Sequence, residues 1–166
     1  MYPDFYIHCL MQDEDLSLLF CHRWLVLCFK REFIESEVLQ IWEACWSRYQ
    51  TDYFHIFICV AIMTLYGKKC IENKMKMDGM MQHFLDMALL FDGPLVLKEA
   101  RSLLYRFHNF QVIPCTLEGL LAGPGIWDGG IEPEIECISR HRKCCFKTSH
   151  SDQILYEFKD KLKSSQ

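Results

Sequence analysis

Apolar side chains spaced three and four positions apart are the feature that most restricts how this chain can fold. In residues 14–30 they fall on one face of a helix, because that spacing matches about 3.6 residues per turn. The expected stripe is Leu16, Leu19, Phe20, Arg23, Trp24, Leu27 and Cys28. Leu25 and Phe29 widen the stripe, whereas His22 and Val26 fall outside it, so the spacing predicts a helix buried on most sides.

Five further segments repeat this spacing. They predict helices at residues 35–49, 52–67, 77–91, 94–110 and 116–123. In the fourth of these, the predicted stripe is Leu97, Ala100, Arg101, Leu104 and Phe107. Strand signals, which are alternating apolar and polar residues bounded by hairpin turns, are nearly absent. The chain is therefore predicted to be all-α, a lobe of about six to seven helices.

Polar residues, glycine and proline mark the expected helix ends. Asp52 and Asp78 are predicted to cap the helices that follow them, and Thr116 is predicted to cap the short helix. Gly67 is predicted to close its helix in the left-handed conformation, which glycine adopts readily. Pro94 belongs at the first position of a helix, where its missing N–H leaves no hydrogen bond unmade.

The chain changes character after residue 123. Residues 1–123 are predicted to form one helical unit, which suits a total length of 166 residues. Residues 124–166 begin rich in glycine and proline and continue polar and mixed in charge, so they predict a largely irregular tail. Within that tail, residues 152–163 are predicted to form at most a short amphipathic helix.

Composition argues against several classes of partner. The chain carries 18 basic and 22 acidic residues, for a formal net charge of −4, whereas nucleic-acid binding favours a basic face. The most apolar run, residues 53–66, is shorter than the about 20 residues that a membrane-spanning helix needs. A buried core helix is therefore favoured over a transmembrane segment. The first residues also lack the basic and apolar regions of a signal peptide.

The 10 cysteines do not predict a disulfide framework. Cys28, Cys45 and Cys59 sit inside apolar helical patterns, where a thiol behaves as a small hydrophobic residue. The chain is therefore expected to be reduced and cytosolic. A cysteine nucleophile needs a facing histidine, but neighbours such as Cys21 and His22 point about 100° apart on a helix. Core thiols are favoured over a cysteine hydrolase.

Metal and cofactor sites are weighed in the same way. Cys137, His141, Cys144, Cys145 and His150 cluster in the tail without the paired spacing of a structural zinc site. An irregular tail is favoured there, and no metal is predicted. The glycines of the tail lack the lysine and the spacing of a phosphate-binding loop, so no cofactor is predicted either.

Three stretches in series suggest a family. FCHRWLVLCFKREF at residues 20–33 is followed by EVLQIWEACW at 37–46 and by DYFHIFICVAI at 52–62. The series resembles the C-terminal half of the TBC domain, which is found in GTPase-activating proteins that act on Rab GTPases. Residues 83–107 are similar to the closing pair of helices of that domain, and the resemblance covers about residues 1–130.

The resemblance implies a structural role for the motif residues. These are Phe20, Arg23, Trp24, Phe29, Lys30, Arg31, Glu32, Phe33, Trp42, Glu43, Phe54, His55 and Phe57. An arginine on an apolar helix face can be a catalytic finger, or it can lock the helix by reaching a carboxylate. The locking role is favoured for Arg23, because the family's finger arginine belongs to a different motif.

The family's catalytic residues are not predicted in this chain. In the family, an I-x-x-D-x-x-R arginine neutralises charge on the transferring phosphoryl group, and a Y-x-Q glutamine positions the attacking water. Such an arginine is worth roughly 10³ to 10⁵ in rate. No aspartate here has an arginine three residues later, and no tyrosine has a glutamine two residues later. We therefore expect the C-terminal lobe of a TBC domain without the lobe that bears the fingers.

Two functions are consistent with these expectations. The resemblance implies a Rab GTPase-activating protein that regulates vesicle trafficking, with a small GTPase as its partner and without being an enzyme in itself. Such a protein is expected in the cytoplasm, on endosomal or other vesicle membranes that it reaches through the GTPase. The alternative is a non-catalytic helical module that binds a small GTPase or another partner.

Overall fold

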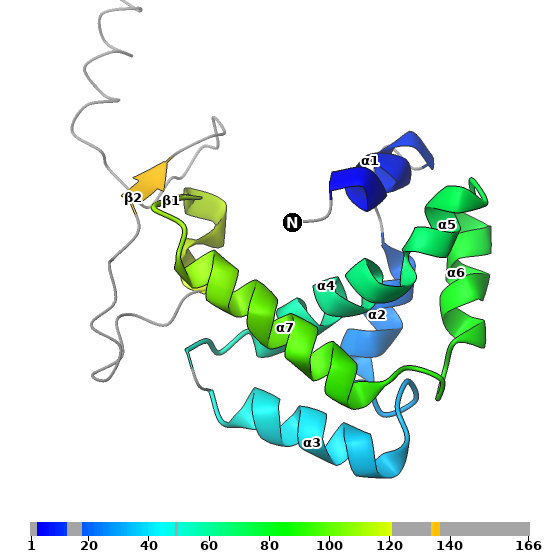
Figure 1. The fold of residues 1–166 in the computed structure, drawn as a ribbon, viewed down its shortest axis with the longest axis horizontal. Coiled ribbons are helices and arrows are strands. Elements are labelled where there is room, and N and C mark those ends of the chain that lie inside the picture. Colours follow the sequence, from blue (N-terminus) through cyan, green and yellow to red (C-terminus); the bar gives the residue numbers. More distant parts are fainter. Residues whose placement is uncertain (1–2, 13–17, 49, 121–133, 137–166) are drawn as a thin grey trace, which may run out of the picture.

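The computed structural model describes residues 3–12, 18–48, 50–120 and 134–136 (Figure 1). Seven α-helices hold most of these residues, which confirms the all-α prediction. They are α1 (Pro3–Gln12), α2 (Leu19–Val26), α3 (Glu35–Trp46), α4 (Phe54–Tyr66), α5 (Lys68–Glu72), α6 (Met77–Asp86) and α7 (Gly93–His108). Two short strands, β1 (Val112–Pro114) and β2 (Glu134–Glu136), pair in parallel, and a 3-10 helix, η1 (Cys115–Leu120), lies between them in sequence.

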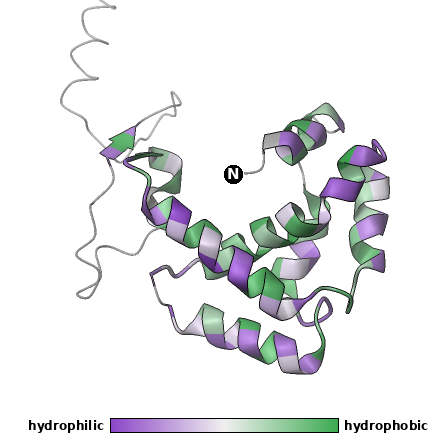
Figure 2. Cartoon of the chain, in the orientation of Figure 1, coloured by the Kyte–Doolittle hydropathy of each residue, from purple (hydrophilic) through white to green (hydrophobic). Residues whose placement is uncertain are grey.

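The helices α4 and α7 form the centre of the lobe, where they pack along each other (Figure 1). α3 packs against both of them, α2 packs against α4 and α6, and α1 contacts α5. Hydrophobic and hydrophilic residues alternate along α7, because this helix buries one face only (Figure 2). No helix in the described part of the chain is both long and apolar enough to cross a membrane.

One continuous hydrophobic core joins all seven helices, from Phe5 of α1 to Ile113 of β1. Trp24, Ile41, Ile58 and Phe84 are among its largest fully buried side chains. Aromatic rings account for much of this packing: the Phe20 and Phe84 ring centroids lie 4.7 Å apart. Residues far apart in sequence thus fold as one unit, so the described helices do not divide into separate domains.

The helix α2 ends at Val26, earlier than the spacing predicts. The N–H of Phe29 donates to the carbonyl of Trp24 at 2.8 Å. The N–H of Cys28 donates to the carbonyl of Leu25 at 3.2 Å. These are the two hydrogen bonds of a Schellman motif, and Cys28 takes the left-handed position with a φ of 46°. No glycine marks this turn in the sequence, so the predicted helix extended past its true end.

The prediction that this helix is buried on most sides is wrong. Phe20, Cys21 and Trp24 face the core. Leu19 and Val26 are 53% and 63% exposed, so the opposite face of α2 is apolar but uncovered by the described residues. Apolar spacing alone cannot separate a helix that is buried all round from one that shows apolar residues at the surface.

Two predicted N-caps and one predicted C-cap are also wrong. No side chain caps α4, and Asp52 instead pairs with Arg48 at 3.6 Å. No side chain caps α6, where Asp78 lies inside the first turn. Gly67, at the end of α4, has a right-handed φ of −74°, so it is not the left-handed residue that was expected.

The helix α7 begins at Gly93, one residue before the predicted first position at Pro94, and its cap was not predicted. The Asp92 side chain accepts a hydrogen bond from the N–H of Leu95 at 2.8 Å and caps the helix. Pro94 lies in the first turn, where no N–H is needed. The short helix predicted at residues 116–123 is the 3-10 helix η1 as far as Leu120.

Most of the predicted tail lies outside the described residues. This includes the helix predicted at residues 152–163 and the Cys/His cluster between Cys137 and His150, so both stay predictions. The strand β2 is a short element in this part of the chain that the sequence did not predict. Its pairing with β1 brings Glu134–Glu136 beside the segment that follows α7.

We predict that Gly67→Ala destabilises the protein, because an added Cβ would overlap the Met63 carbonyl and lie 2.7 Å from the Phe5 ring. Relief of that overlap requires α1 to move, at a cost of about 1–3 kcal/mol in unfolding free energy. Gly79→Ala is the matched control, since its Cβ would meet Met75 at an ordinary 3.5 Å and alanine favours a helix. Urea denaturation measures both, and equal stability of the two variants would contradict the prediction.

Candidate functional site

The aromatic residues of the three motifs form part of the core. Phe20, Trp24, Phe29, Phe33, Phe54 and Phe57 are all at most 5% exposed. The Trp24 ring lies edge-on to Phe84, with centroids 5.2 Å apart, and the Phe33 ring lies 5.7 Å from Phe91. These side chains therefore hold α2, α4 and α6 together, and they offer no titratable or nucleophilic group for chemistry.

A buried ion pair joins the two ends of the first motif stretch, residues 20–33. The guanidinium Nη2 of Arg23 lies 2.7 Å from Oε2 of Glu32, and the Glu32 side chain is fully buried. The Glu32 backbone carbonyl accepts a further hydrogen bond from the N–H of Leu89 at 2.9 Å. Arg23 thus reaches a carboxylate, and this contact fixes the turn between α2 and α3 against the segment that follows α6.

The second carboxylate oxygen of Glu32, Oε1, has no hydrogen-bond partner among the described residues. A carboxylate in this position is costly to bury and depends on its one cation. The Arg23 side chain is 25% exposed, but its guanidinium is engaged with Glu32. It is therefore not a free arginine held ready for a phosphoryl group.

The remaining motif residues lie at the surface or near it. Lys30, Arg31 and Glu43 are exposed. Trp42 is partly buried, and its indole N–H donates to the carbonyl of Cys28 at 2.6 Å. The Lys30 ammonium lies 5.7 Å from the centre of the Trp42 ring, which suits a cation–π contact.

His55 does not meet the other polar motif residues. It is half-buried at the start of α4, and burial lowers its pKa. The Tyr53 ring lies nearby, with centroids 6.0 Å apart. The described contacts of the three motifs are therefore structural, and their polar side chains do not converge on a reactive centre.

The described cysteines are thiols and form no disulfide with one another. Burial raises the pKa of Cys9 and Cys70 to about 11. The pKa of Cys21 is raised as well, first by its hydrogen bond to Cys59 and then by burial. His8 is turned to a backbone carbonyl, that of Met75 at 2.8 Å. No group of three or more metal-binding side chains occurs in the part of the chain that the structure describes.

A groove lies between α3 and α7 and extends to the start of α4. Its wider part has a volume of about 590 Å³, and its narrower part has a volume of about 250 Å³. Ala44, Ser47 and Arg101 line both parts, so the two are continuous. The narrower part has an apolar wall formed by Phe54 and Leu104. Sequence reasoning placed Arg101 in register with the buried stripe of its helix, yet its side chain is exposed at this groove.

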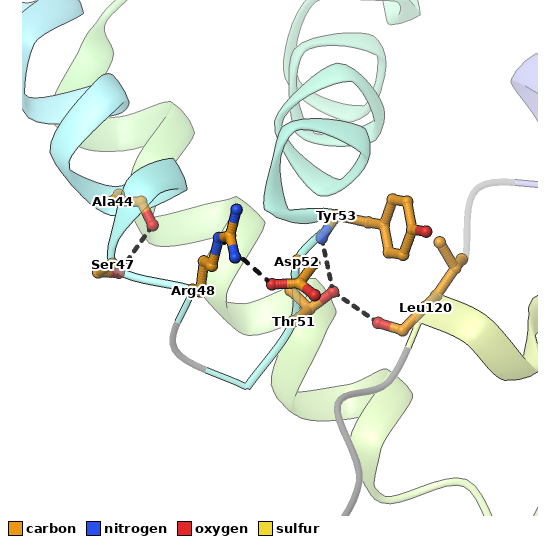
Figure 3. Close-up of polar contacts among 7 residues, drawn as sticks. All are labelled: Ala44, Ser47, Arg48, Thr51, Asp52, Tyr53 and Leu120. Atoms are coloured by element: carbon orange, nitrogen blue, oxygen red, sulfur yellow. Dashed lines mark hydrogen bonds and ion pairs between the residues drawn. The ribbon is translucent and has the colours of Figure 1, made fainter.

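The turn between α3 and α4 borders the groove (Figure 3). The Thr51 hydroxyl donates to the carbonyl of Leu120 at 2.6 Å and accepts from the N–H of Tyr53 at 2.9 Å. Thr51 is fully buried, so this pair of hydrogen bonds ties the end of η1 to the entry of α4. Nothing in the sequence pattern singled out Thr51, because its partner lies 69 residues away.

Comparison with known proteins agrees with the motif series. A family model described as Rab-GTPase-TBC domain matches residues 1–71. TBC1 domain family member 16 of Homo sapiens is 55% identical over 140 residues, which are 82% of this chain and 18% of that protein. The GTPase-activating protein GYP7 of Yarrowia lipolytica is 32% identical over 109 residues, which are 66% of this chain and 15% of that protein.

A third relative, Small G protein signaling modulator 1 of Homo sapiens, is 35% identical over 92 residues, which are 54% of this chain and 8% of that protein. The chain therefore spans less than a fifth of the length of each of these relatives. The similarity covers most of the chain but only a small share of the longer proteins.

We predict that Arg23→Met lowers the free energy of unfolding by about 3 kcal/mol, because it leaves the fully buried Glu32 carboxylate without its cation. The matched control is Arg31→Met in the same turn, where the side chain is exposed and a change within about 0.5 kcal/mol is expected. In the double variant Arg23→Met with Glu32→Gln, stability should recover in part, since no charge is then buried. Denaturant titration that finds both single variants equally stable would refute the role of the pair.

Alkylation should distinguish core thiols from a nucleophile. With iodoacetamide at pH 8, we expect Cys28 to react first, because it is exposed. Cys9 and Cys70, with pKa values of about 11, hold only about a thousandth of their thiols as thiolate at that pH. Peptide mapping by mass spectrometry gives the order. A buried cysteine that reacts faster than Cys28 would favour a cysteine hydrolase.

Proposed function

Because this chain belongs to the Rab-GTPase-TBC domain family, we propose that it forms part of a GTPase-activating protein for Rab proteins. Its helices provide the scaffold of the activating domain, and its partner is a small GTPase of the Rab family. The observation that carries this proposal is the ion pair between Arg23 and Glu32. The pair gives Arg23, the arginine of the first motif stretch, a structural role, and a structural role is what the resemblance to the family implies for it.

The scaffold extends beyond the residues that the family model matches. The match ends at residue 71, whereas the continuous core also takes in α6, α7 and β1. Val96, Leu103 and Phe107 of α7 are buried in this core. We therefore assign residues 1–123 to the TBC domain and residues 124–166 to a tail.

Rate acceleration is not expected from these 166 residues alone. They contain neither an aspartate followed three residues later by an arginine nor a tyrosine followed two residues later by a glutamine. Among the described arginines, Arg23, Arg48 and Arg106 are each paired with a carboxylate. Arg31 and Arg101 are exposed, and neither lies in the family's finger motif. A guanidinium that is paired with a carboxylate keeps its charge, but that charge is engaged and is not free to contact a phosphoryl group.

A second candidate function is supported by the exposed apolar side chains. Leu19 and Val26 on α2 are both more than half exposed. Leu39 on α3 is 54% exposed and Trp46 is 71% exposed. Large apolar residues exposed on a helix are a candidate surface for another protein, here on α2 and separately on α3. In this alternative, the chain is a non-catalytic module that holds a small GTPase or another protein.

Either function places the chain in the cytoplasm. Rab GTPases act on the membranes of vesicles and endosomes, and the chain would reach those membranes through its partner. Its activity in the full-length setting would regulate vesicle traffic.

We predict that the purified chain does not accelerate phosphate release from any member of a panel of GTP-loaded Rab proteins. The Yarrowia lipolytica relative named as a GTPase-activating protein serves as the positive control for the assay. A phosphate sensor measures the rate over the intrinsic rate, and a ratio near 1 is expected throughout. Acceleration by tenfold or more of any Rab would show that a finger exists that the sequence did not reveal.

Binding measurements on the same panel separate the two candidates. Saturable binding of a Rab in its GTP form, without turnover, supports a scaffold or a binding module for that GTPase. The absence of binding to every Rab removes the small GTPase as a partner of this chain. Variants Leu19→Ser and Val26→Ser then test whether the exposed face of α2 takes part, with Lys68→Ala, on the exposed part of α5, as the control.

A further inference from the structure

Three sulfur atoms meet where α2 packs against α4 (Figure 1). The Cys21 thiol lies 4.0 Å from the thioether sulfur of Met63, and it is also hydrogen-bonded to the Cys59 thiol. Cys59 and Met63 are four residues apart on α4, so their side chains lie on the same face of that helix, opposite Cys21. This sulfur cluster is separate from the ion pair of Arg23 and from the groove between α3 and α7.

The sulfur cluster is shielded from water on most sides. Cys21 is 9% exposed and Cys59 is 5% exposed, whereas Met63 is only partly buried. The Cys21 S–H donates to one sulfur neighbour at a time, so the second sulfur beside it receives no proton from this thiol. The cluster therefore offers sulfur lone pairs in a dry place, with an approach to them past Met63.

The donor set restricts the class of ion that suits this place. Two thiols and one thioether are soft donors, which select Cu(I) over harder ions. Magnesium and calcium take oxygen ligands, and a structural zinc site takes four ligands. Among the described residues, histidine, cysteine and carboxylate side chains do not form a group of three, so none of them completes a zinc site beside Cys21 and Cys59.

The spacing of the sulfur atoms suits an ion with three ligands. A bond between a metal ion and a thiolate is about 2.3 Å long, so three such bonds at 120° place their sulfur atoms about 4.0 Å apart. The sulfur atoms of Cys21 and Met63 are 4.0 Å apart. An ion at the centre of the cluster therefore needs no movement of α2 relative to α4.

We propose that Cys21, Cys59 and Met63 form a binding site for a soft monovalent cation, of which Cu(I) is the representative. The two thiols bind as thiolates and release one proton each, and the thioether completes a trigonal set. No atom is oxidised or reduced in this step. Because the unfolded chain does not hold the three sulfur atoms together, the bound ion joins α2 to α4 and stabilises the folded lobe.

Competition for Cu(I) tests the proposal. The full chain carries serine at Cys28, which is exposed, and at Cys137, Cys144 and Cys145, which lie outside the described residues. Cu(I) is titrated without oxygen against the coloured chelator bathocuproine disulfonate. We expect the protein to retain one equivalent. Its dissociation constant should fall about a hundredfold for each unit by which the pH rises, one factor of ten for each proton released.

Single substitutions identify the ligands. Met63→Leu keeps the apolar volume and removes only the sulfur, so it should weaken binding by at least about tenfold, the loss that even an outer partner of a metal site causes. Cys59→Ala removes a thiolate and should weaken binding more. Cys70→Ala is the matched control, because it removes a fully buried thiol from α5 and should leave the affinity unchanged.

Two further measurements make the result specific. X-ray absorption of the loaded protein should show three sulfur atoms at about 2.3 Å from the ion and no nitrogen or oxygen ligand. Circular dichroism shows whether each variant keeps its helices. Met63→Leu decides the matter if Cys59→Ala does not fold, since leucine preserves the packing of α4.

Three outcomes would overturn the proposal. The first is removal of Cu(I) by the chelator as readily from the protein as from Cys59→Ala, which would mean an adventitious ion only. The second is full affinity in Met63→Leu, since the site would then lack its third ligand. The third is an equal loss of affinity in Cys70→Ala and Cys59→Ala, which would assign the ion to other thiols. None of these measurements involves a GTPase, so the proposed function stands or fails separately.

Discussion

The fully buried carboxylate of Glu32 is the constraint on which the arrangement of the first helices depends. A charge without water needs a cation and hydrogen-bond donors, and Arg23 supplies a contact of 2.7 Å from the preceding helix. The Glu32 backbone carbonyl is held at the same time by the N–H of Leu89. Because Phe33 follows directly and is buried, a shift of the turn would expose a phenylalanine and leave the charge unpaired.

This arrangement explains why a charged stretch lies in the middle of an apolar core. In the stretch KREF, residues 30–33, Lys30 and Arg31 are exposed, whereas Glu32 is buried. Residues of one motif are thus divided between solvent and core by a tight turn. Through Glu32 and the buried Phe33, this stretch holds the turn between α2 and α3 in place.

The sequence predicted the fold better than the site. Periodicity identified α3, α4 and α7 because they bury faces at regular intervals of three and four residues. The helices α1 and α5 were not predicted. The helix ends were harder, since Asp52 and Asp78 had competing roles and Cys28 took a left-handed conformation without being glycine. The sequence could predict that Arg23 pairs with a carboxylate. It could not predict that Glu32 is the partner, because the turn that brings the two together has no local sequence signal. Arg101 was predicted to lie on the buried stripe of its helix. It is exposed instead, because the small residues Ala44 and Ser47 leave a groove opposite it.

The distribution of indole rings has a spectroscopic consequence. Trp24 is completely buried, whereas Trp42 and Trp46 are stacked on each other on α3, with centroids 5.6 Å apart and Trp46 largely in solvent. A buried indole is expected to emit further to the blue than an exposed one, and stacked indoles are expected to couple in near-ultraviolet dichroism. The described residues thus offer one optical reporter for the interior and one for the docking of α3. Their unfolding curves would reveal whether that helix detaches before the rest melts.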